Sequence, residues 1–97
     1  MTRRAPSGDR FVADSYVPRG SGPSVDQLVL DVRHATAASE ERVRLIRCIE
    51  LPDDELCTWT FEADSEASVR AIGSAADLEL ERVTRAVERW PAPRPRS

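Results

Sequence analysis

Two carboxylates and a phenol fall on one face of two predicted strands, and they are the residues best suited to chemistry. Asp14 and Tyr16 belong to a strand predicted for residues 11–17, and Glu62 to one predicted for residues 56–63. Side chains alternate between two faces along a strand, so all three are expected on the same side of a sheet. Such a set suits acid–base catalysis by Asp14 or Glu62, with Tyr16 donating a hydrogen bond. The alternative is that both carboxylates pair with arginines at a subunit interface.

Cys48 is expected beside this set and extends it to a metal site. Asp14, Cys48 and Glu62 offer two oxygens and one soft sulfur to a divalent ion. The alternative for Cys48 is a small, partly buried packing residue. The other cysteine, Cys57, lies between aromatic positions and is expected in the core.

Other chemistry-bearing residues have simpler interpretations. His34 is the single histidine, and its position beside a helical apolar stripe indicates a surface residue. With one histidine and no CxxC motif, a closed zinc site is not expected. The acidic run at residues 50–55 lacks the spacing of a calcium loop and is read as a solvated turn. Trp90 is read as an anchor at the end of the core or as a lid on a cavity.

The elements that must position these residues follow from periodicity and capping. Ser24, with Gln27 three residues later, predicts the start of a helix that ends near residues 39–41. Residues 43–51 and 56–63 alternate as strands around a Pro-Asp turn, which predicts an antiparallel hairpin. Asp64 or Ser65 is expected to cap a second helix. Residues 80–89 suit a strand or a helix, and a strand is chosen because it completes the layout.

The layout is therefore β-α-β-β-α-β, an α+β fold of the ferredoxin-like sandwich type. Two helices with one apolar stripe each must cover one face of an antiparallel sheet, with the first and third strands central. The residues expected under the helices are Phe11, Ala13, Val17, Leu45, Ile49, Cys57, Trp59, Phe61, Val83 and Val87. The residues expected on the uncovered face are Val12, Asp14, Tyr16, Ile46, Cys48, Glu50, Thr58, Thr60 and Glu62.

The uncovered face is too mixed for open water and too polar for a core. Two such faces pressed together in a homodimer, an α+β barrel, would enclose a partly polar cavity, and ligands commonly bind in cavities. The chain has 97 residues, enough for one domain with a modest core, which also favours dimerisation.

Composition limits the domain organisation and the partners. Residues 1–9 and the proline-rich residues 91–97 are expected to be disordered tails around a domain at 10–90. The net charge of −3 argues against nucleic-acid binding, which needs a clustered positive field. No apolar run is long enough to span a bilayer and no signal peptide is evident, so a cytoplasmic location is expected.

Several segments resemble a known family. Residues 10–18, RFVADSYVP, are similar to its opening strand, and residues 44–65 run like its hairpin, in which a Pro-x-Asp-Glu turn leads to Phe-Glu-Ala-x-Ser. The family is the nickel-binding-protein-like group of small bacterial domains. The resemblance implies a ferredoxin-like fold, probable dimerisation and nickel binding in at least one relative. The chain departs from the family's pattern at Cys48, where serine is usual, and at Ala76-Asp77, where a glycine often follows the second helix.

Three functions remain open at this point. The first is a dimeric small-ligand or metal-binding protein, with nickel suggested by the resemblance. The second is a cofactor-free enzyme, such as a cyclase, isomerase or oxygenase, that acts on a hydrophobic metabolite through Asp14 or Glu62. The third is a purely structural or interaction module. Whether the chain is an enzyme is left undecided by the sequence.

Overall fold

The computed structural model describes residues 8–89, and Trp90 and the proline-rich segment lie outside the described residues. The strands are β1 (Asp9–Tyr16), β2 (Val43–Leu51), β3 (Leu56–Ala63) and β4 (Glu81–Ala86). The helices are α1 (Val25–Ala38) and α2 (Glu66–Ala75), and a short 3-10 turn, η1 (Pro52–Asp54), joins β2 to β3. The α+β layout is therefore confirmed, and β1 already begins at Asp9, inside the segment expected to be a tail.

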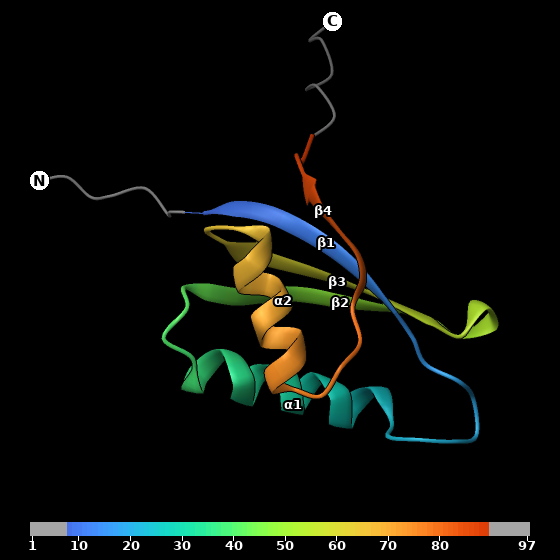
Figure 1. Ribbon diagram of the computed structural model, residues 1–97. Coiled ribbons are helices and arrows are strands. Elements are labelled where there is room, and N and C mark those ends of the chain that lie inside the picture. The colour runs from blue at the N-terminus through green and yellow to red at the C-terminus, as the bar shows by residue number, and fades with distance from the viewer. Residues whose placement is uncertain (1–7, 90–97) are drawn as a thin grey trace, which may run out of the picture.

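The four strands form one antiparallel sheet in the order β2-β3-β1-β4, with both helices on the same side of it (Figure 1). Ser24 caps α1 as predicted, and Ser65, one of the two predicted candidates, caps α2. Ser24 accepts a hydrogen bond from the backbone N–H of Gln27, and Ser65 accepts one from that of Ser68. These caps satisfy backbone donors that the first helical turn leaves without partners.

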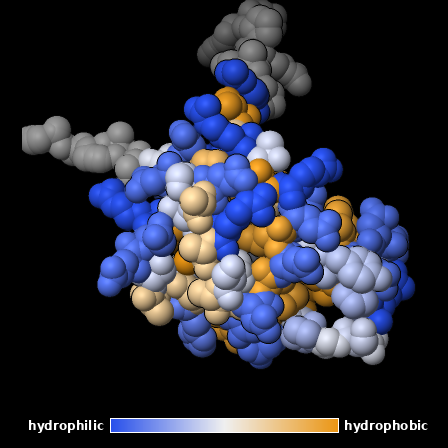
Figure 2. Space-filling view, in the orientation of Figure 1, coloured by the Kyte–Doolittle hydropathy of each residue, from blue (hydrophilic) through white to orange (hydrophobic). Residues whose placement is uncertain are grey.

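The core lies between the helices and the odd-numbered residues of the two central strands. It contains Phe11, Ala13, Cys57, Trp59, Phe61, Ala63 and Val83 from the sheet and Leu28, Val32, Val69 and Ile72 from the helices. Apolar side chains also reach the surface beside α2, with hydrophilic ones around them (Figure 2). A domain of this size cannot bury all of its apolar surface.

Two bulges change the alternation that the sequence predicts. In β2 the register shifts between Leu45 and Arg47, because the bulge inserts one extra residue, Ile46, opposite β3. Beyond it, Cys48 pairs with Trp59 on the helix side, whereas Ile49 pairs with Thr58 on the uncovered side. The predicted faces of Cys48, Ile49 and Glu50 are therefore wrong.

In β4 the register shifts between the partners of Val12 and Asp14, and Arg82 takes a left-handed conformation with φ 55°. Because of this bulge, Val83 is buried in the core and Glu81 lies directly opposite Asp14 on the neighbouring strand. Val87, expected under the helices, lies beyond the strand and is 63% exposed. Among residues 8–89, neither helix has the length and apolar character needed to cross a membrane.

Candidate functional site

Asp14 and Glu62 face the same side of the sheet but do not form a pair. Asp14 is directly opposite Thr58 on β3, whereas Glu62 is directly opposite Arg10 on β1. Thr58 and Glu62 are four residues apart, which places the two carboxylates roughly 13 Å apart along the strands at about 3.3 Å per residue. The predicted carboxylate pair is therefore wrong, because strand parity fixes the face of a residue but not its register.

Glu62 is held instead by two arginines of its own chain. Arg44 donates from Nη2 and Nε to Glu62 Oε1 at 3.0 and 3.2 Å, and Arg10 Nη1 lies 3.4 Å from Glu62 Oε2. The Glu62 side chain is only 14% exposed. Glu62 is thus an acceptor in an ion-pair cluster, as in the alternative interpretation, although both arginines belong to the same subunit.

The same cluster extends to the end of the described chain. Arg10 Nε donates to Glu88 Oε1 at 3.2 Å, and Arg47 Nη2 lies 3.7 Å from Glu88 Oε2. The side of the sheet that the helices leave uncovered is called the open face below. Its charged end consists of Arg10, Arg44, Arg47, Glu62 and Glu88. Glu62 and Glu88 therefore find their counter-charges within one chain.

Asp14 lies elsewhere on the open face and has a different acidic neighbour. The hydroxyl of Thr58 approaches Asp14 Oδ1 at 3.4 Å, and Glu81 is directly opposite Asp14 on β4. Like charges directly opposite each other on a sheet are mutually repulsive. Glu81 is the acidic neighbour that the sequence did not indicate, because only the bulge at Arg82 brings it to this position.

Tyr16 does not point toward either predicted partner. It is 60% exposed, and its hydroxyl donates to Glu55 Oε1 at 3.0 Å. That hydrogen bond and the negative charge of Glu55 raise the pKa of Tyr16 above its ordinary value. A phenol with a raised pKa keeps its proton at neutral pH, so Tyr16 can donate a hydrogen bond but does not act as a base there.

Apolar side chains gather at the other end of the open face, next to Asp14. Tyr16 pairs with Leu56 and Leu56 with Leu51, while Thr58 pairs with the edge residue Ile49. Ile49 is 48% exposed and Leu51 is 39% exposed. The apolar end of the open face consists of Tyr16, Ile49, Leu51 and Leu56.

Cys48 is not beside Asp14 or Glu62. The bulge at Ile46 turns it to the helix side, where it packs against the core. Burial, helped by the neighbouring Cys57 and Glu50, raises the pKa of Cys48 to about 12. The thiol is protonated at neutral pH, so it is not a reactive nucleophile, and its predicted place in a metal site with Asp14 and Glu62 is wrong.

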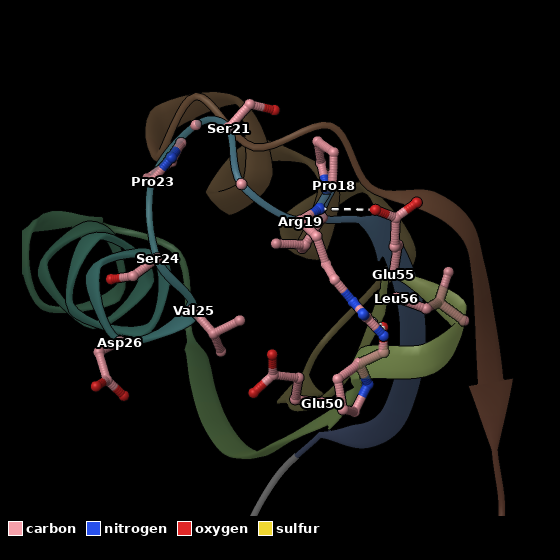
Figure 3. Close-up of a pocket in the computed structure, with 14 residues that line it drawn as sticks. Pro18, Arg19, Ser21, Pro23, Ser24, Val25, Asp26, Glu50, Glu55 and Leu56 are labelled. Atoms are coloured by element: carbon pink, nitrogen blue, oxygen red, sulfur yellow. Dashed lines mark hydrogen bonds between the residues drawn. The ribbon is translucent and has the colours of Figure 1, made fainter.

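A surface pocket that the sequence analysis missed lies between the β1–α1 loop and the β2–β3 turn (Figure 3). Its volume is about 480 Å³. The backbone N–H of Arg19 donates to Glu55 Oε2 at 2.7 Å, and its guanidinium donates to the Pro52 carbonyl and to Asp53. The segment PRGSGP at 18–23, with two prolines and two glycines, is the one signal of this pocket in the sequence.

These contacts keep Glu55 ionised and fix the loop. The backbone N–H of Arg19 and the Tyr16 hydroxyl lower the pKa of Glu55 below its ordinary value. Glu50 also points into the space between the loop and the hairpin (Figure 3). Arg19 and Glu55 are engaged with each other and with the hairpin, so these contacts tie the loop to the turn.

Nickel does not fit the residues that the structure brings together. Within residues 8–89, no three His, Cys, Asp or Glu side chains are close enough to hold a metal ion. The one histidine, His34, is exposed on α1, as predicted, far from the open face of the sheet. The donor set for a metal that prefers nitrogen and oxygen ligands is therefore not assembled in the described part of one chain.

Comparison with known proteins assigns no identity. No protein-family pattern matches this chain, and no curated protein is significantly similar to it.

Proposed function

We propose that this chain is a small-ligand-binding protein that acts as a homodimer, with two open sheet faces packed around a partly polar cavity. The observation that carries the proposal is the composition of that face. Exposed Ile49, Leu51 and Tyr16 lie beside Asp14, while both helices pack on the opposite side of the sheet. An apolar surface of this kind, bordered by polar residues, marks an interaction site.

The proposed fold is ferredoxin-like, and the proposed assembly is an α+β barrel made by two sheets. The strand order β2-β3-β1-β4 and two helices on one face support this assignment. The resemblance of the hairpin sequence to a family of small ferredoxin-like domains points the same way.

The open face has two ends with different roles in this dimer. The apolar end is the natural contact between copies, because burying it from water stabilises the dimer by about 25 cal/mol per Å² of apolar surface. The charged end can lie at the edge of the dimer interface without leaving a buried charge unpaired, because Glu62 already pairs with Arg10 and Arg44. The twofold axis therefore passes closer to Ile49 than to Glu62.

The residues around the cavity indicate the class of ligand. Asp14 and Glu81 offer carboxylate oxygens next to the apolar end, and the Thr58 hydroxyl approaches Asp14. An organic molecule with an apolar body and an N–H, O–H or cationic group matches this combination, because its body contacts the apolar side chains and its polar group binds the carboxylates. The cofactor-free enzyme alternative has less support, because the Tyr16 hydroxyl donates to Glu55 and Glu62 lies between Arg10 and Arg44, away from Asp14.

The dimer is tested with two matched variants. Ile49 on the open face and Leu30 on α1 are each 48% exposed, so replacing either by arginine changes the surface equally. Sedimentation equilibrium should show a dimer for the wild type and for Leu30→Arg, and a monomer for Ile49→Arg. A wild type that is monomeric at all concentrations, or a dimer that Leu30→Arg disrupts instead, would overturn the proposal.

Calorimetric titration with Ni²⁺ separates an organic ligand from nickel. The proposal predicts no heat of binding at micromolar protein. Stoichiometric binding that Asp14→Asn abolishes would instead assign the cavity of the dimer to nickel.

A further inference from the structure

The two cysteines are neighbours across β2 and β3 on the helix side of the sheet. Cys48 is directly opposite Trp59, and Cys57 is directly opposite Glu50. The two cysteines are therefore diagonal neighbours on one face, and the bulge at Ile46 is the feature that brings Cys48 to it. The two thiols also shift each other's pKa, in keeping with this diagonal placement.

The pair lies against apolar core residues, with the carboxylate of Glu50 as a charged neighbour. Cys57 is fully buried, and Cys48 is partly buried and packs against the core. Because β2 is an edge strand, Cys48 is the end of the pair nearer to solvent. Burial raises the pKa of both thiols, so neither carries a charge at neutral pH.

The diagonal register argues against a disulfide. Diagonal neighbours on antiparallel strands have Cα atoms about 7–8 Å apart. Disulfides usually need Cα atoms roughly 4.4–6.8 Å apart, so closing one here would move the backbone. The wider span suits a single atom bound between the two sulfurs.

We propose that Cys48 and Cys57 form a binding site for a thiophilic metal cation that accepts two ligands, with Hg²⁺ as the best-matched ion. Thiolates select soft cations. Within residues 8–89 no third His, Cys, Asp or Glu joins the pair in a cluster, so zinc and nickel, which need more ligands, do not fit. Both thiols lose their protons to solvent as two metal–sulfur bonds form, and no oxidant or reductant takes part.

Charge decides between the soft cations. A divalent cation and two thiolates make a neutral complex, whereas Cu⁺ or Ag⁺ would leave a net negative charge in a largely buried site next to Glu50. The site therefore binds Hg²⁺ in preference to the monovalent ions. Because binding must release protons from thiols with raised pKa values, affinity rises with pH.

The test uses the full chain, HgCl₂ as probe and an excess of a small monothiol as competitor. Native mass spectrometry should show one mercury per chain, with both thiols blocked to a colorimetric thiol reagent. Cys48→Ser should bind mercury roughly a hundredfold or more weakly against the competitor, because the intramolecular second ligand is lost. Zn²⁺ and Ni²⁺ should not compete.

Several results would overturn the proposal. They are two mercury ions per chain, a Cys48→Ser variant that binds as tightly as the wild type, or effective competition by Zn²⁺. Cys57→Ala keeps the test valid if Cys48→Ser fails to fold, since either variant removes one of the two ligands. Phenylarsine oxide is a second probe, because a stable adduct requires both thiols and should form only in the wild type.

Discussion

The indole Nε1 of Trp59 donates a hydrogen bond to the hydroxyl of Ser15 at 2.8 Å, and both residues are buried beneath the helices. Ser15→Ala removes the acceptor and leaves a buried N–H without a partner, which should lower the free energy of unfolding by about 1–3 kcal/mol. Urea unfolding followed by circular dichroism measures this loss. The exposed loop residue Ser21, changed to alanine, is the control and should change stability little. Equal stabilities for the two variants would contradict the assigned role of Ser15.

Glu62 should contribute more to stability than an ordinary surface carboxylate. Its side chain is 14% exposed between Arg10 and Arg44, whereas Glu66 is 52% exposed and pairs with Arg70. Glu62→Gln should cost about 1 kcal/mol or more at low salt, and Glu66→Gln about 0.3–0.5 kcal/mol. Chemical denaturation with urea at low and high salt tests this, because salt should reduce both losses. A smaller loss for Glu62 than for Glu66 would show that the cluster does not stabilise the fold.

Glu55 should make stability depend on pH in the acidic range. Its pKa is lowered in the folded state, chiefly because the backbone N–H of Arg19 donates to it. A group of this kind stabilises the fold above its unfolded pKa, near 4.3, and loses that contribution as pH falls through the folded pKa. The stability advantage of the wild type over Glu55→Gln should thus be present at about pH 6 and shrink below about pH 4.

Unfolding free energies measured across that range test the prediction for Glu55. Glu79→Gln, at an exposed position, is the control and should follow the wild type. An advantage of the wild type that grows on acidification would contradict the assigned hydrogen bonds.

Asp77 occupies a position that favours glycine. It follows α2 with φ 57°, and the N–H of the next residue, Leu78, donates to the carbonyl of Gly73 at 2.8 Å. A left-handed conformation costs a non-glycine residue roughly 1 kcal/mol, so Asp77→Gly should raise the thermal unfolding midpoint. Asp77→Ala should lower it, since alanine lacks the short polar side chain that tolerates this conformation. A lower midpoint for the glycine variant would be inconsistent with this helix end.

The sequence predicted the elements well because each had a local signal. Ser24 and Ser65 mark the helix starts by their capping chemistry, and the alternation along β3 matches the observed burial of Cys57, Trp59 and Phe61. The Pro-Asp turn also predicted the hairpin that η1 closes.

The site was less predictable because it depends on register. The apolar residues of β2 stand at 43, 45, 46, 48, 49 and 51, so its alternation is broken, but the pattern does not say at which residue the register shifts. The bulge reverses the faces of Cys48 and Ile49, which removes the predicted sulfur ligand and adds an apolar residue to the open face. The separation of Asp14 from Glu62 likewise follows from pairing between strands, which no segment encodes alone.

The central claim is that the open sheet faces of two copies pack through their apolar ends. Isotope-filtered nuclear Overhauser spectroscopy on a mixture of labelled and unlabelled protein tests it most directly, because it detects contacts between copies alone. The account predicts contacts between copies from the methyl groups of Ile49, Leu51 and Leu56, and none from Leu30. Contacts from Leu30 without any from Ile49, or no contacts between copies at all, would contradict it.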